Sequence, residues 1–139
     1  MDPSPRHRSN WLNAWVLAFI TWCLLVLTLS LMAHPPAVRL PWFSWDKVQH
    51  ACAYALLTLL AARSFCLLAP ASRLVWPAAA GFAFLFGILM EVLQFLTGNG
   101  RVAELSDVFA NASGILVVCC LAALYSSLKP RRPQRRGAG

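Results

Sequence analysis

The sequence predicts an all-α membrane protein with four transmembrane helices and both termini in the cytoplasm. Its 139 residues are 59% hydrophobic and only 12% charged, whereas soluble domains carry about a quarter charged residues. At a mean hydropathy of +0.61, the chain has more apolar surface than a core of this size could bury, so the surplus must face lipid. Four long apolar runs separated by short polar segments then suggest four spans.

The first predicted span runs from Trp11 to Ala33, after a polar, basic head of residues 1–10. Its length suits a helix crossing a hydrocarbon layer of about 30 Å. A cleaved signal peptide is the alternative, because Arg6 and Arg8 precede the run. The run is too long for a signal-peptide core, however, and no clear small-residue cleavage site follows it. We therefore expect a transmembrane helix.

The second predicted span covers Asp46–Ala69. Residues 34–45 precede it and contain three prolines, which prevent a regular helix, together with aromatic residues that suit a membrane interface. Arg63 lies toward the far end of the span, where its long side chain can reach the membrane surface. The polar end of this span is therefore its beginning.

The third predicted span covers Leu74–Thr97, and the fourth covers Asp107–Leu128. Pro77 falls in the first turn of the third span, where proline is tolerated. A short polar loop, residues 98–106, joins the two spans. The basic tail of residues 129–139 is too charged and proline-rich to fold by itself, so we expect it to be disordered.

The distribution of basic residues predicts the orientation of the four spans. Nine Lys and Arg residues lie in the termini and the second loop, against Arg39, Lys47 and Arg101 on the opposite side. The positive-inside rule then places both termini in the cytoplasm. The net charge of +7 is explained by this orientation signal, so we expect no nucleic-acid partner. Membrane lipids are the expected surroundings.

Acidic residues gather at the predicted outer ends of the second, third and fourth spans. On the second span, Asp46, His50 and Tyr54 are four residues apart and therefore share one helix face. On the fourth span, Asp107 and Asn111 share a face in the same way. Gly114 continues this face and would allow a neighbouring helix to approach closely.

Glu91 indicates that these polar faces converge inside the bundle. It extends a row of small residues, Ala79, Ala83 and Gly87, which marks a helix contact. An ionised side chain facing lipid near the bilayer centre would cost about 2.5 to 3.5 kcal/mol, so Glu91 should face its neighbours. The sequence therefore predicts an outward-facing polar pocket. Its lining comprises Asp46, Lys47, His50, Tyr54, Glu91, Gln94, Arg101, Glu104, Asp107 and Asn111.

The order and spacing of these residues resemble the VanZ-like family of small bacterial membrane proteins, over roughly residues 15 to 125. The pattern is Asp46-Lys47-x-x-His50-x-x-x-Tyr54-x-x-Leu57, then Glu91-x-x-Gln94, then Arg101, then Asp107-x-x-x-Asn111-x-x-Gly114. Glu104 is absent from that pattern. It is a predicted site residue only because it belongs to the predicted pocket.

The resemblance implies a four-helix membrane domain, here residues 11–128, in the inner (cytoplasmic) membrane of a bacterium. It also implies a link to resistance against the glycopeptide antibiotic teicoplanin, which is associated with the family's namesake. Oligomeric state is left open, because no GxxxG motif marks a dimer face.

Four functions are compatible with the predicted pocket. The first is a purely structural network of polar residues that holds the helices together. The second is a binding site for an amphiphilic ligand at the outer leaflet, a lipid-linked cell-wall precursor or a glycopeptide, with Lys47 and Arg101 holding phosphate or carboxylate oxygens. A third possibility is a transporter or proton relay, although the polar residues stop in the outer half of the spans.

A membrane-embedded hydrolase acting on a lipid substrate is the fourth possibility. Asp46, His50, Glu91 and Asp107 would supply its acids and bases or hold a metal. Because the chain lacks HExxH and GxSxG motifs, we assign neither a cofactor nor a metal, and whether the protein is an enzyme is left open.

Overall fold

The computed structural model describes residues 5–32, 45–70, 72–97 and 104–128; the side chains of residues 5–13 and of Trp45 lie outside this description. The described residues form four helices and no strand: α1 (Pro5–Leu31), α2 (Trp45–Leu68), α3 (Val75–Thr97) and α4 (Leu105–Leu128). Each helix contains a segment long and apolar enough to cross a membrane. The predicted all-α membrane protein with four spans is therefore confirmed.

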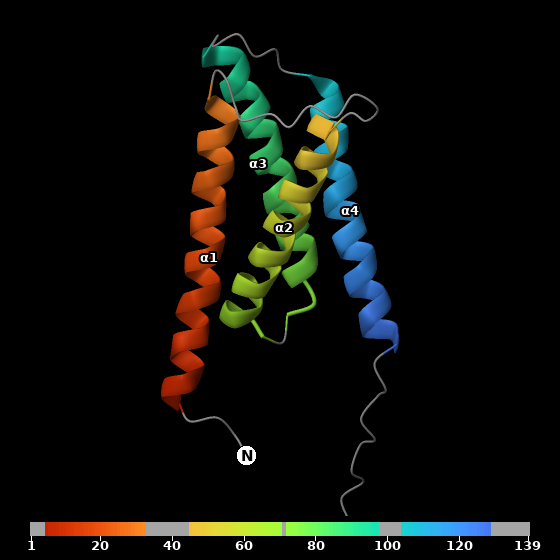
Figure 1. Cartoon of the computed structure of the whole chain (residues 1–139). Helices are drawn as coiled ribbons and strands as arrows, with labels where there is room; N and C mark the ends of the chain where they lie inside the picture. Colours follow the sequence, from red (N-terminus) through yellow and green to blue (C-terminus); the bar gives the residue numbers. More distant parts are fainter. Residues whose placement is uncertain (1–4, 33–44, 71, 98–103, 129–139) are drawn as a thin grey trace, which may run out of the picture.

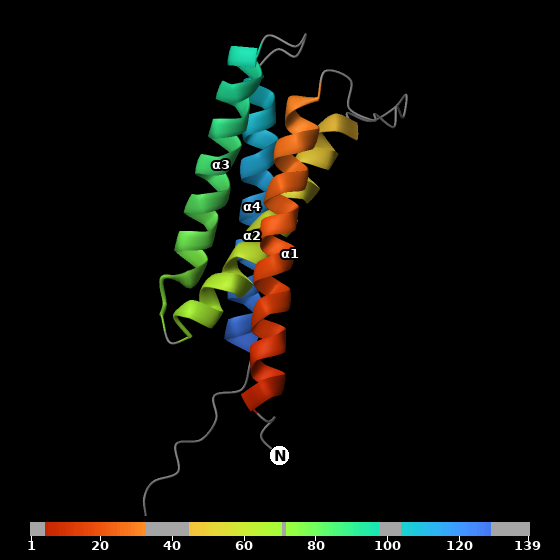
Figure 2. The ribbon, with the colours of Figure 1, turned by 90° about the vertical axis from the view of Figure 1, so that its left-hand side faces the viewer.

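The four helices run alternately up and down the bundle, so that α1 begins and α4 ends at the same end (Figure 1). Helix α2 packs against all three other helices, whereas α1 and α4 make no contact within the described chain. Turning the bundle shows the same arrangement, with α1 in front of α2 and α3 to one side (Figure 2). The end at which α2 and α4 begin and α3 ends is called the polar end below.

Helices α2 and α4 meet most closely at Gly114. A Cβ atom added there would lie 1.9 Å from the backbone oxygen of Ala51, a separation that real atoms do not reach. Only glycine therefore fits this contact, as expected from the position of Gly114 on the polar face of α4. The close approach brings the first turns of the two helices, and their charged side chains, together.

The row of small residues on α3 faces the interior as predicted. Ala79, Ala83 and Gly87 are buried, and Glu91 at the end of the row is buried as well. A Cβ atom on Gly87 would lie 3.0 Å from the Tyr54 ring and 3.1 Å from Nδ2 of Asn111. The missing side chain thus leaves room for two of the predicted site residues.

The structure corrects the helix boundaries at two places. Helix α1 begins at Pro5, six residues before the predicted Trp11, because the apolar run marks only the part of the helix in lipid. Proline is well suited to the first position of such a helix. Helix α4 begins at Leu105 rather than Asp107, and the Asp107 N–H donates to the Glu104 carbonyl at 2.9 Å, which closes the first turn.

Candidate functional site: an acid–histidine cluster at the polar end

Lys47 is the centre of the charged cluster at the polar end. Its Nζ forms an ion pair with Oδ1 of Asp107 on α4. The same ammonium lies 3.0 Å from Oε2 of Glu104 and 3.5 Å from Oδ2 of Asp46. Lys47 therefore links the start of α2 to the start of α4, with one carboxylate from α2, one from α4 and one from Glu104, which directly precedes α4.

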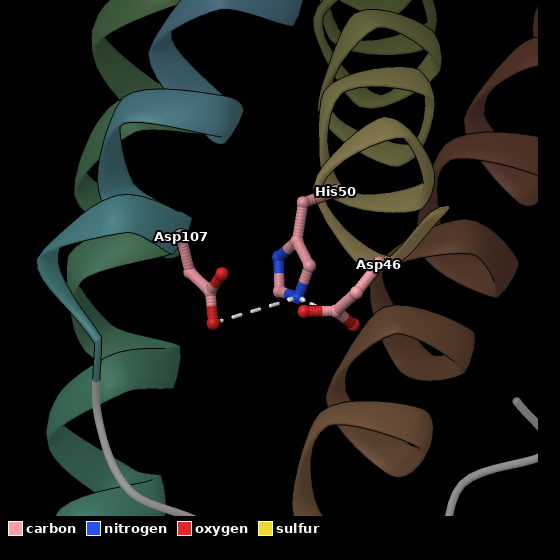
Figure 3. Close-up of side chains that lie close together, drawn as sticks. All are labelled: Asp46, His50 and Asp107. Carbon is pink, nitrogen blue, oxygen red and sulfur yellow. Dashed lines mark ion pairs between the residues drawn. The ribbon is translucent and has the colours of Figure 1, made fainter. Parts of the chain in front are cut away.

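His50 lies one turn further along α2 and faces two of the same carboxylates. Its Nε2 is 3.9 Å from Oδ1 of Asp46 and 3.9 Å from Oδ2 of Asp107. The three side chains point toward one another from the two helices (Figure 3). On the other side of the ring, Nδ1 lies 3.1 Å from Oδ1 of Asn111. The spacing predicted for both helix faces thus brings these residues together.

The cluster carries excess negative charge and passes from buried to exposed. Among the described side chains, three carboxylates surround the single ammonium of Lys47, which leaves two negative charges. The Asp107 side chain is only 7% exposed, whereas the side chains of Asp46 and Glu104 are 55% and 56% exposed. The buried carboxylate anchors the cluster, and the other two face outward.

Glu104 connects the cluster to α3. Its backbone N–H donates to Oε2 of the buried Glu91 at 3.2 Å, and its carboxylate also accepts a hydrogen bond from the Ser106 hydroxyl at 2.8 Å. The hydrogen bond from Lys47, followed by that from Ser106, holds the pKa of Glu104 below its usual range. Sequence reasoning missed Ser106, although a hydroxyl in the first turn of a helix beside an acid is a recognisable signal.

Tyr54 and Asn111 form the floor of the cluster. Both side chains are almost fully buried and lie against Gly87 of α3, where glycine leaves the space that they occupy. Asn111 also contacts His50, so the ring is held from below. These two residues therefore lie on the buried side of the cluster, against α3.

Gln94 does not join the cluster in the described structure. Gln94 is buried, but its Nε2 donates to the backbone oxygen of Ser30 at 2.9 Å, which ties α3 to the end of α1. Arg101 lies outside the described residues. The sequence contains no signal for this contact with α1, because its acceptor is a backbone oxygen, which every residue carries.

The geometry changes the role expected of Lys47. A lysine that holds phosphate or carboxylate oxygens of a ligand needs free donors, whereas this ammonium already faces three carboxylates of the protein. The cluster is therefore better suited to accept hydrogen bonds or a cation than to bind an anion directly. Within the described chain, single ligand atoms of Asp46, His50 and Asp107 lie within 4.8 Å of one another, so they could hold a metal ion once the exposed Asp46 side chain turns inward.

Comparison with known proteins gives one match. Residues 6–126 match the model of the family described as VanZ/LLP1, which covers all four helices and the whole described cluster. No curated protein and no solved structure matches the chain. The four apolar helices and the family match over most of the chain agree, so this membrane protein belongs to the VanZ-like family.

Proposed function

We propose that the polar end binds the headgroup of an amphiphilic envelope ligand, either a lipid-linked cell-wall precursor or a glycopeptide of the teicoplanin type. The positive-inside count supports an outward-facing polar end, with both termini in the cytoplasm of a bacterium and the four spans in its inner membrane. A ligand with its tail in the outer leaflet would then have its headgroup at the level of the cluster.

The excess negative charge of the cluster is the observation that carries this proposal. A network that only joins helices needs as many positive as negative charges. The described carboxylates around Lys47, however, outnumber its single positive charge by two. Ionisable groups within membrane spans are costly and usually mark a functional site. Close packing of α2 on α4 is achieved separately, at Gly114, and does not require the exposed Asp46.

The carboxylates define the kind of headgroup that would bind. Ionised Asp and Glu only accept hydrogen bonds, so the exposed Asp46 and Glu104 suit hydroxyl and ammonium groups. Sugars and amino groups, which cell-wall precursors and glycopeptides carry, supply such donors. The phosphates of a lipid-linked precursor would have to lie away from these two carboxylates, or reach them through a cation.

Binding of defined ligands to the purified full chain tests this proposal. Fluorescent undecaprenyl-linked precursor and teicoplanin would each be titrated into wild type, Asp46→Asn and Phe82→Leu in detergent. We expect saturable binding of at least one ligand, weakened about tenfold by Asp46→Asn, the equivalent of about 1.4 kcal/mol. Phe82→Leu, which lies in the other half of the bundle, should leave the affinity unchanged. Absence of binding by wild type would refute the proposal.

A hydrolase remains the second candidate because one observation favours it. His50 Nε2 faces two carboxylates of different burial, an arrangement in which one acid and one base can differ in proton affinity. Release of inorganic phosphate from undecaprenyl diphosphate by wild type, lost in Asp107→Asn, would support catalysis. If wild type releases no more phosphate than a control membrane without the protein, the hydrolase function is refuted.

A further inference from the structure

We propose that Asp46, His50 and Asp107 form a binding site for one divalent metal ion that takes mixed imidazole and carboxylate ligands, with Zn²⁺ as the best fit. This inference goes beyond headgroup binding, because the ion would bind in the absence of any lipid. Three protein ligands and an open position are typical of zinc sites that also contact a substrate.

The two aspartates use different oxygens for Lys47 and for His50. Lys47 contacts Oδ1 of Asp107 and Oδ2 of Asp46. The other oxygen of each carboxylate, Oδ2 of Asp107 and Oδ1 of Asp46, faces Nε2 of His50. An ion bound between those two oxygens and Nε2 would therefore leave the contacts of Lys47 intact.

His50 is oriented as a metal ligand. Its Nδ1 lies 3.1 Å from Oδ1 of Asn111, and a carbonyl oxygen can only accept, so Nδ1 is the donor. In the neutral ring this leaves the lone pair of Nε2 directed at the two carboxylates (Figure 3). Metal-binding histidines are held in this way by a hydrogen bond from the nitrogen that does not bind the metal.

Asp107 supplies a buried oxygen that receives no hydrogen bond within the described chain. The side chain is 7% exposed, and its Oδ2 lies 3.9 Å from His50 Nε2. A buried carboxylate oxygen without a donor is costly. A metal ion between Oδ2 and Nε2 would satisfy both atoms at once.

The distances allow one ion to reach all three ligands. Zn²⁺ lies about 2.0 to 2.2 Å from nitrogen and oxygen ligands, so its ligand atoms are about 3.4 Å apart in a tetrahedral site and can be no more than about 4.4 Å apart. Nε2 meets this limit with both oxygens, at 3.9 Å. All three atoms lie within 4.8 Å, and the exposed side chain of Asp46 can turn inward to close the remaining gap. A divalent ion would also balance the two excess negative charges around Lys47.

Zinc titration of the purified full chain tests the site. Protein without a histidine tag would be treated with a chelator, freed of it, and titrated with Zn²⁺ by calorimetry, with bound metal counted by elemental analysis. We expect one Zn²⁺ per chain and a rise in the Tm of unfolding as the metal binds the folded state. Failure of wild type to bind Zn²⁺ saturably would overturn the proposal.

Asp46→Asn and Glu104→Gln form a matched pair for this test. Both variants remove one carboxylate charge from Lys47, and both side chains are about equally exposed, but only Asp46 faces Nε2 of His50. We expect Asp46→Asn to weaken Zn²⁺ binding at least tenfold and Glu104→Gln to change it less than about threefold. Equal weakening in both variants would show attraction by charge alone and would contradict coordination by the three residues.

Discussion

The two halves of the bundle are held together by different forces. At the polar end, Lys47 joins α2 to α4 through carboxylates, and His50 and Asn111 continue the polar contact inward. In the other half, where α2 ends and α3 begins, aromatic rings join α1, α2 and α3. Phe82 lies 5.3 Å from Phe19 and 6.2 Å from Phe65 between ring centroids, in edge-to-face geometry.

This difference separates what builds the fold from what can perform chemistry. The aromatic half packs apolar side chains around buried alanines, and its Arg63 guanidinium lies over the Trp15 ring. At the polar end, the charges of the described residues are not all balanced, and they extend from the interior to the surface. Changes in the aromatic half should therefore alter stability alone, whereas changes at the polar end should alter stability, binding or both.

Gly114→Ala should have the largest effect, because it separates the two helices that carry the cluster. The new Cβ would lie 1.9 Å from the Ala51 oxygen, so α2 and α4 must move apart, at a cost we expect to reach about 3 kcal/mol. Membrane abundance and Tm would be measured beside Gly81→Ala, whose Cβ meets nothing within 4 Å. A wild-type Tm for Gly114→Ala would show that the helices do not meet there.

Lys47→Met should be the next most damaging change. Without the ammonium, the buried Asp107 loses its ion pair, and we expect a loss of about 2 to 3 kcal/mol in the free energy of unfolding. Arg63→Met removes the same charge from the other half, where the guanidinium lies 5.7 Å from the Trp15 ring centre. That contact contributes about 0.5 to 1 kcal/mol. Equal losses in Tm would contradict the difference between the halves.

Phe82→Leu should lower stability without affecting the polar end. It removes the edge-to-face contacts with two other rings, worth about 1 kcal/mol. We expect a lower Tm with unchanged affinity for Zn²⁺ and for headgroup ligands. A change in either affinity would show that the two halves are coupled.

Glu104→Gln should have the smallest effect on stability, because the carboxylate is exposed and Lys47 keeps its contacts with Asp107 and Asp46. The pKa of Glu104 is lowered by Lys47, so its contribution is complete at neutral pH and is lost as the pH falls through that lowered pKa. Thermal unfolding of wild type and variant should therefore differ slightly at neutral pH and converge in acid. A difference that grows in acid would contradict this sign.

The sequence predicts the fold well because membrane thickness directly sets how long an apolar run must be to form a transmembrane helix. All four spans appear where expected, with ends shifted by one or two residues except at the start of α1. That end could not be predicted from hydropathy, since a helix can continue into water beyond its apolar run. Four of the residues that α3 buries, Ala79, Ala83, Gly87 and Glu91, follow directly from their four-residue spacing.

The cluster is predicted only in part. Helical spacing brings His50 and Asn111 to one place, but it cannot say which oxygen of Asp107 faces Lys47 and which faces His50. It also cannot show that Gln94 turns to α1, because that contact depends on how the helices pack. The central position of Lys47 among three carboxylates emerges only when α2 and α4 are placed side by side.

Teicoplanin susceptibility most directly tests the claim that the polar end is a functional site. A sensitive host would express wild type, Asp46→Asn or Phe82→Leu, with membrane abundance and Tm measured on the same preparations. We predict that wild type protects, that Asp46→Asn loses protection at unchanged abundance and Tm, and that Phe82→Leu retains it despite a lower Tm. Full protection by Asp46→Asn, or none by wild type, would contradict the claim.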